Sequence, residues 1–80
     1  MSEITRVGVD LAKNLIQVHA VDNAGKVVTN RQLPRNKFIE WCAQLPAGCI
    51  VALEASAGSH QWVRKLISLG FDARIMAAHL

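Results

Sequence analysis

The chain has 80 residues, of which 51% are hydrophobic and 19% are charged, and its formal net charge is +3. This length excludes more than one small domain, and the longest uncharged apolar stretch, 49–53, is far shorter than the about 20 residues of a membrane-spanning helix. The basic residues are scattered, so the charge permits a polyanionic partner without identifying one. Because the first residues also lack the pattern of a secretion signal, we expect a cytoplasmic protein with no membrane contact.

The first part of the chain predicts three strands. Residues 4–10 are rich in β-branched side chains, and residues 15–21 alternate between apolar and polar side chains after a connection over 11–14. The sequence at 22–25, Asp-Asn-Ala-Gly, favours a tight turn, because Asn and Gly accept the positive φ values that such turns need. Residues 26–33 are therefore expected to form a third strand, antiparallel to the second.

A helix is predicted after Pro34, which interrupts the strand pattern. Asn36 is the expected N-cap of a helix over 37–45, whose apolar side chains fall on one face. Cys42 in this helix and Cys49 after it match no zinc-binding spacing. We expect both cysteines to be reduced and to act as small apolar side chains.

The remainder of the chain predicts a strand, a second helix and a last strand. Residues 49–54 form an apolar run closed by an acid, which suits a central parallel strand. Ser59 follows a loop of small residues and is expected to cap a helix that runs to about residue 69, with Gly70 at its C′ position. Residues 71–76 form the last predicted strand.

The predicted order is thus three strands, helix, strand, helix, strand, which indicates an α/β fold with a mixed sheet. An antiparallel start followed by βαβ units favours the ribonuclease H-like architecture, with the related actin-like ATPases as the alternative. No linker or low-complexity stretch divides the chain, so residues 1–80 are interpreted as one portion of such a domain.

Two acids, Asp10 and Glu54, each close a predicted strand. If the two strands are neighbours, both carboxylates emerge at the edge of the sheet where ligands of open α/β sheets bind. Paired carboxylates repel each other, and a bound Mg²⁺ or Mn²⁺ removes that repulsion and prefers oxygen ligands. The alternative is that Asp10 caps a turn and Glu54 is an exposed charge at a strand end.

Four further residues are weaker candidates for contacts with nucleic acid. Lys13 and Asn14 follow Asp10 and could touch a phosphate backbone, although solvated loop residues would look the same. Ser56 lies before a predicted helix N-terminus, a natural place for a phosphate, and His60 lies near the same turn. A tight turn explains these residues equally well, and a lone histidine is more often structural or on the surface.

Three segments, taken in order, resemble the DEDD transposases of insertion sequences, which are related to the Piv DNA invertase and, by fold, to the RuvC resolvase. The segments are Val7-Gly8-Val9-Asp10-Leu11-Ala12-Lys13, the hairpin over 22–27, and Val51-Ala52-Leu53-Glu54-Ala55-Ser56-Ala57-Gly58 followed by His60. Ser56 departs from the threonine that is usual in the family. The resemblance extends from about Thr5 to Leu80, and it is the order of the segments that makes it specific.

The resemblance implies that Asp10 and Glu54 are the first two catalytic, metal-binding acids of that family. It places the other two acids just past the strand that ends at residue 76, so we expect these 80 residues to hold half of the cluster, to bind Mg²⁺ weakly and to be inactive alone. It also implies metal-dependent cleavage and transfer of double-stranded DNA in the bacterial cytoplasm at the nucleoid. Oligomeric assembly is a further implication, and many members use a structured guide RNA.

Two other functions remain open at this stage. The segment 7–10 with the following hairpin also resembles the first phosphate loop of actin-like ATPases and sugar kinases, but residues 11–14 offer no glycine to wrap a phosphate, which favours the transposase. Alternatively, the chain is a non-catalytic remnant that associates with itself through an open sheet edge.

Overall fold

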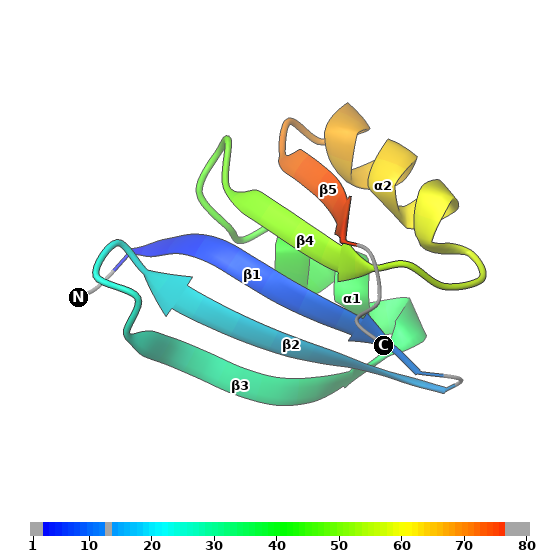
Figure 1. Ribbon diagram of the computed structural model, residues 1–80, viewed down its shortest axis with the longest axis horizontal. Helices are drawn as coiled ribbons and strands as arrows, with labels where there is room; N and C mark the ends of the chain where they lie inside the picture. Colours follow the sequence, from blue (N-terminus) through cyan, green and yellow to red (C-terminus); the bar gives the residue numbers. More distant parts are fainter. Residues whose placement is uncertain (1–2, 13, 77–80) are drawn as a thin grey trace.

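The computed structural model describes residues 3–12 and 14–76. Its elements, in chain order, are β1 (Ile4–Leu11), β2 (Leu15–Asp22), β3 (Val27–Pro34), α1 (Arg35–Cys42), β4 (Ile50–Glu54), α2 (Ser59–Ser68) and β5 (Asp72–Met76). The five strands form one sheet in the order β3-β2-β1-β4-β5 (Figure 1). The β1–β2 and β2–β3 pairs are antiparallel, and the β1–β4 and β4–β5 pairs are parallel. The predicted α/β class and the predicted order of elements are confirmed.

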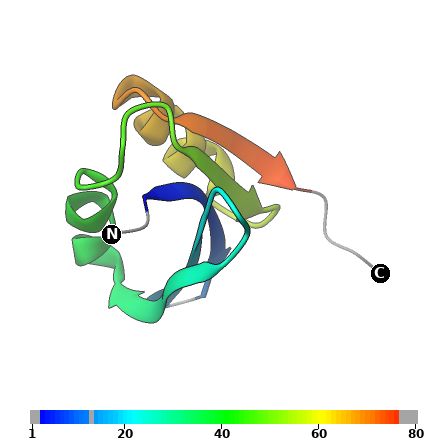
Figure 2. The same ribbon diagram turned by 90° about the vertical axis from the view of Figure 1, so that its left-hand side faces the viewer.

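Both helices pack on the same face of the sheet (Figure 2). The Phe38 ring of α1 meets the Trp62 ring of α2 edge-on, with 5.1 Å between their centroids and an angle of 87° between their planes. Beneath them lies a core of buried apolar side chains: Val7, Val9, Ile16, Val18, Ala20, Leu33, Phe38, Cys42, Leu45, Cys49, Val51, Leu53, Leu66 and Phe71. Within 3–12 and 14–76, no helix covers the other face of the sheet, which we call the open face (Figure 1).

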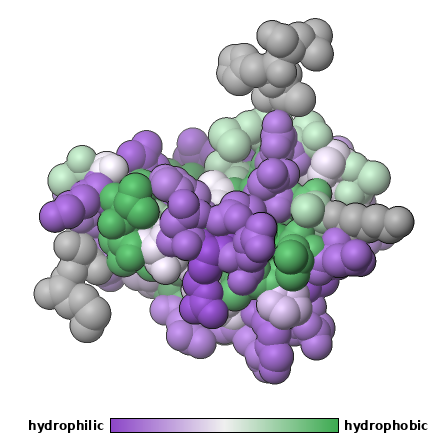
Figure 3. Space-filling view, turned by 90° about the horizontal axis from the view of Figure 1, so that it is seen from below, coloured by the Kyte–Doolittle hydropathy of each residue, from purple (hydrophilic) through white to green (hydrophobic). Residues whose placement is uncertain are grey.

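Alternation along the strands assigns each side chain to one of these faces. In β1, Val7 and Val9 are buried against the helices, so Gly8 and Asp10 belong to the open face. In β2 the buried apolar side chains are Ile16, Val18 and Ala20, which leaves Gln17 and His19 on the open face. On the side of β3, seen from below in Figure 3, the surface is mostly hydrophilic with smaller hydrophobic patches. No helix of the described residues is long and apolar enough to cross a membrane.

The first helix begins earlier and ends earlier than predicted. Pro34, with φ −60° and ψ 148°, ends β3 and is itself the N-cap, so the prediction of Asn36 in that role is wrong. The ring of proline fixes φ near this value and lets the helix start at the next residue. The amides of Gln44 and Leu45 donate to carbonyls only three residues back, which tightens the chain into a turn before Pro46.

The second helix also starts differently from the prediction. Gly58, in the left-handed region with φ 86°, is the N-cap, and Ser59 is the first helical residue rather than the cap. The Ser59 hydroxyl instead donates to the Ser56 carbonyl at 2.8 Å and accepts from the Ser56 amide at 3.3 Å. Ser59 is 1% exposed, so this buried hydroxyl fixes the loop between Glu54 and α2.

The end of α2 follows the prediction. Gly70 has φ 93°, its amide donates to the Ile67 carbonyl, and the Phe71 amide donates to the Leu66 carbonyl. This pair of hydrogen bonds is the Schellman arrangement, in which a left-handed residue satisfies the last carbonyls of a helix. Phe71 is buried beyond the turn and carries the chain directly into β5.

Both cysteines are free and buried, as the sequence predicted. Burial, together with the neighbouring Cys49 thiol, raises the pKa of Cys42 from 9.0 to about 12. Burial likewise raises the pKa of Cys49. The two thiols are therefore held in their neutral form inside the core.

We expect a thiol reagent at mildly alkaline pH to label Cys42 and Cys49 far more slowly in the folded chain than in urea, because the thiolate is the reactive form. Between pH 9.0, where the unfolded Cys42 thiol titrates, and about 12, the folded chain binds more protons. The free energy of unfolding should therefore fall as pH rises through this window. Urea unfolding on both sides of pH 9.0 measures the slope, and Cys42→Ala should flatten it. Equal labelling rates in the folded chain and in urea would contradict the burial of the two thiols.

Candidate functional site

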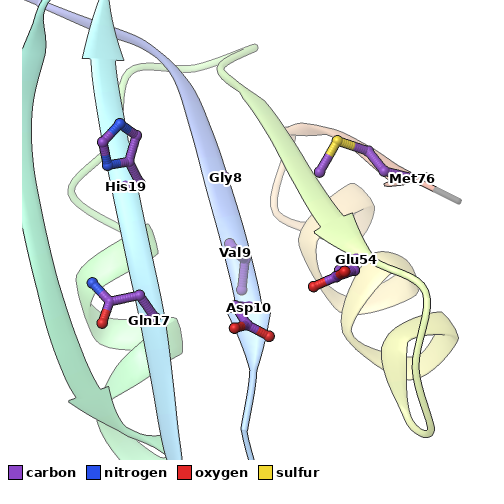
Figure 4. Close-up of a pocket in the computed structure, with 7 residues that line it drawn as sticks. All are labelled: Gly8, Val9, Asp10, Gln17, His19, Glu54 and Met76. Atoms are coloured by element: carbon purple, nitrogen blue, oxygen red, sulfur yellow. The ribbon is translucent and has the colours of Figure 1, made fainter. Parts of the chain in front are cut away.

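The two predicted acids lie on neighbouring strands at the open face. β1 and β4 pair in parallel with Val9 opposite Leu53, so Asp10 and Glu54 follow side by side in the same register. Adjacent strands are about 4.8 Å apart, which brings two such side chains within reach of one small ligand. Figure 4 shows both carboxylates on the same side of the sheet, and both residues are exposed. The arrangement that the sequence predicted for this pair is present.

The acids share a pocket of about 430 Å³. It is lined by Gly8, Val9, Asp10, Gln17, His19, Glu54 and Met76 (Figure 4). Four strands contribute to it. Besides β1 and β4, which carry the acids, β2 supplies the Gln17 amide and the His19 imidazole, and β5 supplies the Met76 thioether. A pocket of this volume is large enough for a small ligand or for one unit of a polymer.

Gly8 forms the floor of the pocket between the acids and His19. It lies directly opposite His19 in β2 and opposite Ala52 in β4. A Cβ at this position would find its nearest neighbour, the His19 carbonyl oxygen, at 3.9 Å, so a side chain would fit but would project into the pocket. The absence of a side chain at Gly8 therefore gives the pocket its depth.

Gln17 and His19 were not predicted as site residues. Gln17 lies opposite Asp10, and His19 lies opposite Gly8, in the antiparallel β1–β2 pair. Alternation alone assigns the two side chains to one face, but their distance from Asp10 depends on the register of the hairpin, which residue spacing did not determine. His19, expected on general grounds to be structural or at the surface, is exposed and lines the pocket.

The donor set fits a divalent cation only in part. Asp10 and Glu54 offer carboxylate oxygens, which Mg²⁺ and Mn²⁺ prefer. Among residues 3–12 and 14–76, however, no group of three or more His, Cys, Asp and Glu side chains could hold a metal ion. The remaining coordination positions of a cation held here would be filled by water, by a substrate or by residues outside the described part.

Of the weaker candidates, Asn14, Ser56 and His60 do not line this pocket. Lys13 falls outside the residues that the structure describes. Asn14 is exposed beside the start of β2, and His60 is exposed on the first turn of α2. Ser56 is engaged through its backbone with the Ser59 hydroxyl. Contacts of these residues with nucleic acid stay predictions.

Arg35 ties this end of the sheet to the helices, and sequence reasoning gave no signal for it. Its Nη1 donates to the Ala12 carbonyl at 3.2 Å, two residues after Asp10. Its guanidinium also lies over the Trp62 ring, 5.7 Å from the centroid. One side chain at the start of α1 thereby connects the end of β1 with α2.

Comparison of the amino-acid sequence with known proteins finds similarity to transposases. No family model matches the chain. It is 45% identical over 74 residues, 92% of its length, to a "Probable family 20 transposase" of Pseudomonas aeruginosa, and covers 22% of that protein. It is 32% identical over 77 residues, 96% of its length, to the transposase for insertion sequence element IS1111A of Coxiella burnetii, of which it covers 21%. It is 30% identical over 77 residues, 96% of its length, to the transposase for insertion sequence element IS1328 of Yersinia enterocolitica, of which it covers 23%. The chain thus spans about a fifth of the length of the curated relatives it matches.

Proposed function

We propose that the chain is the N-terminal part of a DNA transposase of insertion sequences, and that it forms part of a ribonuclease H-like (RuvC-like) catalytic domain of the DEDD type. The similarity to named transposases over 92% or more of its length supports the proposal. The mixed five-stranded sheet, in which an antiparallel start is followed by two parallel strand pairs, is compatible with the proposal. The proposed partner is double-stranded DNA, and a guide RNA, oligomeric assembly and a cytoplasmic, nucleoid-associated location rest on the resemblance.

The observation that carries the proposal is the side-by-side placement of Asp10 and Glu54 on the open face. Asp10 is held within β1, and Glu54 is the last residue of β4, so the positions of both backbones are fixed by sheet hydrogen bonds. When bound between them, Mg²⁺ or Mn²⁺ would supply positive charge to a reacting phosphate and to its attacking and leaving oxygens. The role of the two carboxylates is to hold and orient that charge.

Two carboxylates give few ligands, and Mg²⁺ bound by few protein groups keeps most of its water. We therefore propose that the 80-residue chain binds Mg²⁺ weakly and neither cleaves nor joins DNA by itself. Strand cleavage and transfer would belong to a longer protein in which further acids complete the cluster.

Titration of the chain with Mn²⁺, followed by NMR, tests the site. Paramagnetic broadening is expected first at the amides of 9–11 and 53–55, while the hairpin at 22–25, at the other end of β2, should keep its signals. Broadening that spares the acids would refute the proposed site, and sub-micromolar affinity would refute its weakness. Displacement of Mn²⁺ by ATP with signal changes at 11–14 would favour the nucleotide-binding alternative.

A further inference from the structure

Four polar side chains that carry no carboxylate extend across the open face from the strand beside Asp10. They are Gln17 and His19 of β2 and Asn30 and Gln32 of β3, here called the amide–imidazole strip. In the antiparallel β2–β3 pair, Gln17 lies opposite Gln32 and His19 lies opposite Asn30, so all four share one face. Gln17 Nε2 donates a hydrogen bond to Asn30 Oδ1 across the two strands.

The chemistry of the strip suits a nucleic-acid strand. Each amide offers two donor hydrogens and an acceptor oxygen, so the bond between Gln17 and Asn30 leaves both side chains with further capacity. Amides and imidazoles donate to phosphate oxygens and pair with base edges. The strip contains no carboxylate, so a polyanion on it meets no like charge until it reaches Asp10, where the proposed cation would compensate.

The strip is continuous with the pocket of the acids. Gln17 and His19 line that pocket, and Gln17 is the direct neighbour of Asp10 across the β1–β2 pair. Figure 4 shows both β2 side chains on the same side of the sheet as the two carboxylates. From β1 to β3 the face is about 10 Å wide, because neighbouring strands are about 4.8 Å apart. That width corresponds to about three nucleotides at the roughly 3.4 Å rise of a DNA strand.

We propose that the amide–imidazole strip binds one strand of DNA and holds the nucleotides beside the phosphate that reacts at Asp10 and Glu54. The strand crosses β3 and β2 and places its phosphate at β1. This assignment rests on the proposed function, since it takes the acids as the reacting end of the site. It adds the residues that position the substrate there.

Titration of the 80-residue chain with a short single-stranded DNA in EDTA tests the strip without the cation. The side-chain amide signals of Gln17, Asn30 and Gln32 and the ring signals of His19 are expected to shift together. The double variant Gln17→Ala, Asn30→Ala should weaken binding about three- to tenfold, the effect of losing one or two hydrogen bonds. The matched control, Gln44→Ala with Gln61→Ala, removes two exposed amides that lie outside the pocket and should leave the affinity unchanged.

A charge-adding variant separates this assignment from the proposed function. Gln17→Glu places a third carboxylate opposite Asp10, so DNA binding in EDTA should weaken at least as much as in the double alanine variant. Mn²⁺ binding should instead tighten several-fold, because one more oxygen ligand is supplied.

If Mn²⁺ broadens Asp10 and Glu54 but DNA shifts none of the strip signals, the strip assignment is wrong and the acid site stands. If DNA shifts the strip and Mn²⁺ spares the acids, the proposed function fails while the strand-binding surface stands. Unchanged DNA affinity in Gln17→Glu, or tighter binding of RNA than of DNA, overturns the assignment.

Discussion

Replacing Asp10 with Asn and Glu54 with Gln is expected to abolish divalent-cation binding at the open face and to leave the fold intact. Each change removes a negative charge and keeps the size of the side chain, so the sheet loses none of its hydrogen bonds. Because divalent-cation affinity depends on the number of charged oxygen ligands, each single variant should weaken Mn²⁺ binding by about tenfold or more. Both residues are exposed, so their replacement should change the stability little.

Calorimetry and Mn²⁺ broadening measure this loss in the chain itself, and strand-cleavage assays measure it in a full-length relative that carries the same acids. Glu40→Gln is the matched control, because Glu40 is an exposed acid on α1 whose carboxylate pairs with Lys37 at 3.4 Å. Cation binding that survives the double variant would place the site elsewhere. If the double variant of a full-length relative still cleaves DNA, the two acids take no part in the reaction.

Replacing Phe38 with Ala is expected to remove a large share of the stability of the fold. Phe38 is 0% exposed, and its ring packs edge-on against Trp62, so it joins α1 to α2 above the sheet. Removing a buried phenylalanine side chain costs about 3–5 kcal/mol, whereas a whole small domain is stable by only about 5–15 kcal/mol.

Urea unfolding followed by tryptophan fluorescence measures the effect, since Trp62 reports directly on the contact. Ile67→Ala is the control, because this α2 side chain is 56% exposed and its loss should change the free energy of unfolding by less than about 0.5 kcal/mol. Similar losses in the two variants would show that the ring pair does not anchor the helices.

The sequence predicted the order of the elements because each element has its own hydrophobic period. The strand over 15–21 alternates cleanly, and the run over 49–53 is continuously apolar before Glu54 closes it, as expected for an internal parallel strand. The helix starts were less predictable. Asn36 and Ser59 have the side chains that usually cap helices, yet backbone conformation at Pro34 and Gly58 decided both starts. Cap preferences are small in energy and yield to the geometry of the adjoining strand or loop.

The candidate site was predictable to the extent that it depends on strand ends. Asp10 and Glu54 could be placed together because parallel strands bring their carboxyl ends to one edge. Gln17 and His19 could not, because their position relative to Asp10 depends on the register that the connection between β1 and β2 sets. Arg35 contacts the Ala12 carbonyl, two residues after Asp10, from another element, and no local pattern encodes that contact.

The packing of both helices on one side of the sheet divides the tasks of β2 between alternate positions. Residues 16, 18 and 20 face the buried interior, so changes there should act on folding and be felt throughout the molecule. Residues 17 and 19 face solvent, so changes there can alter what the surface recognises while the scaffold stays as it is. A strand built in this way allows recognition to diverge between related proteins one position at a time, without each step endangering the fold.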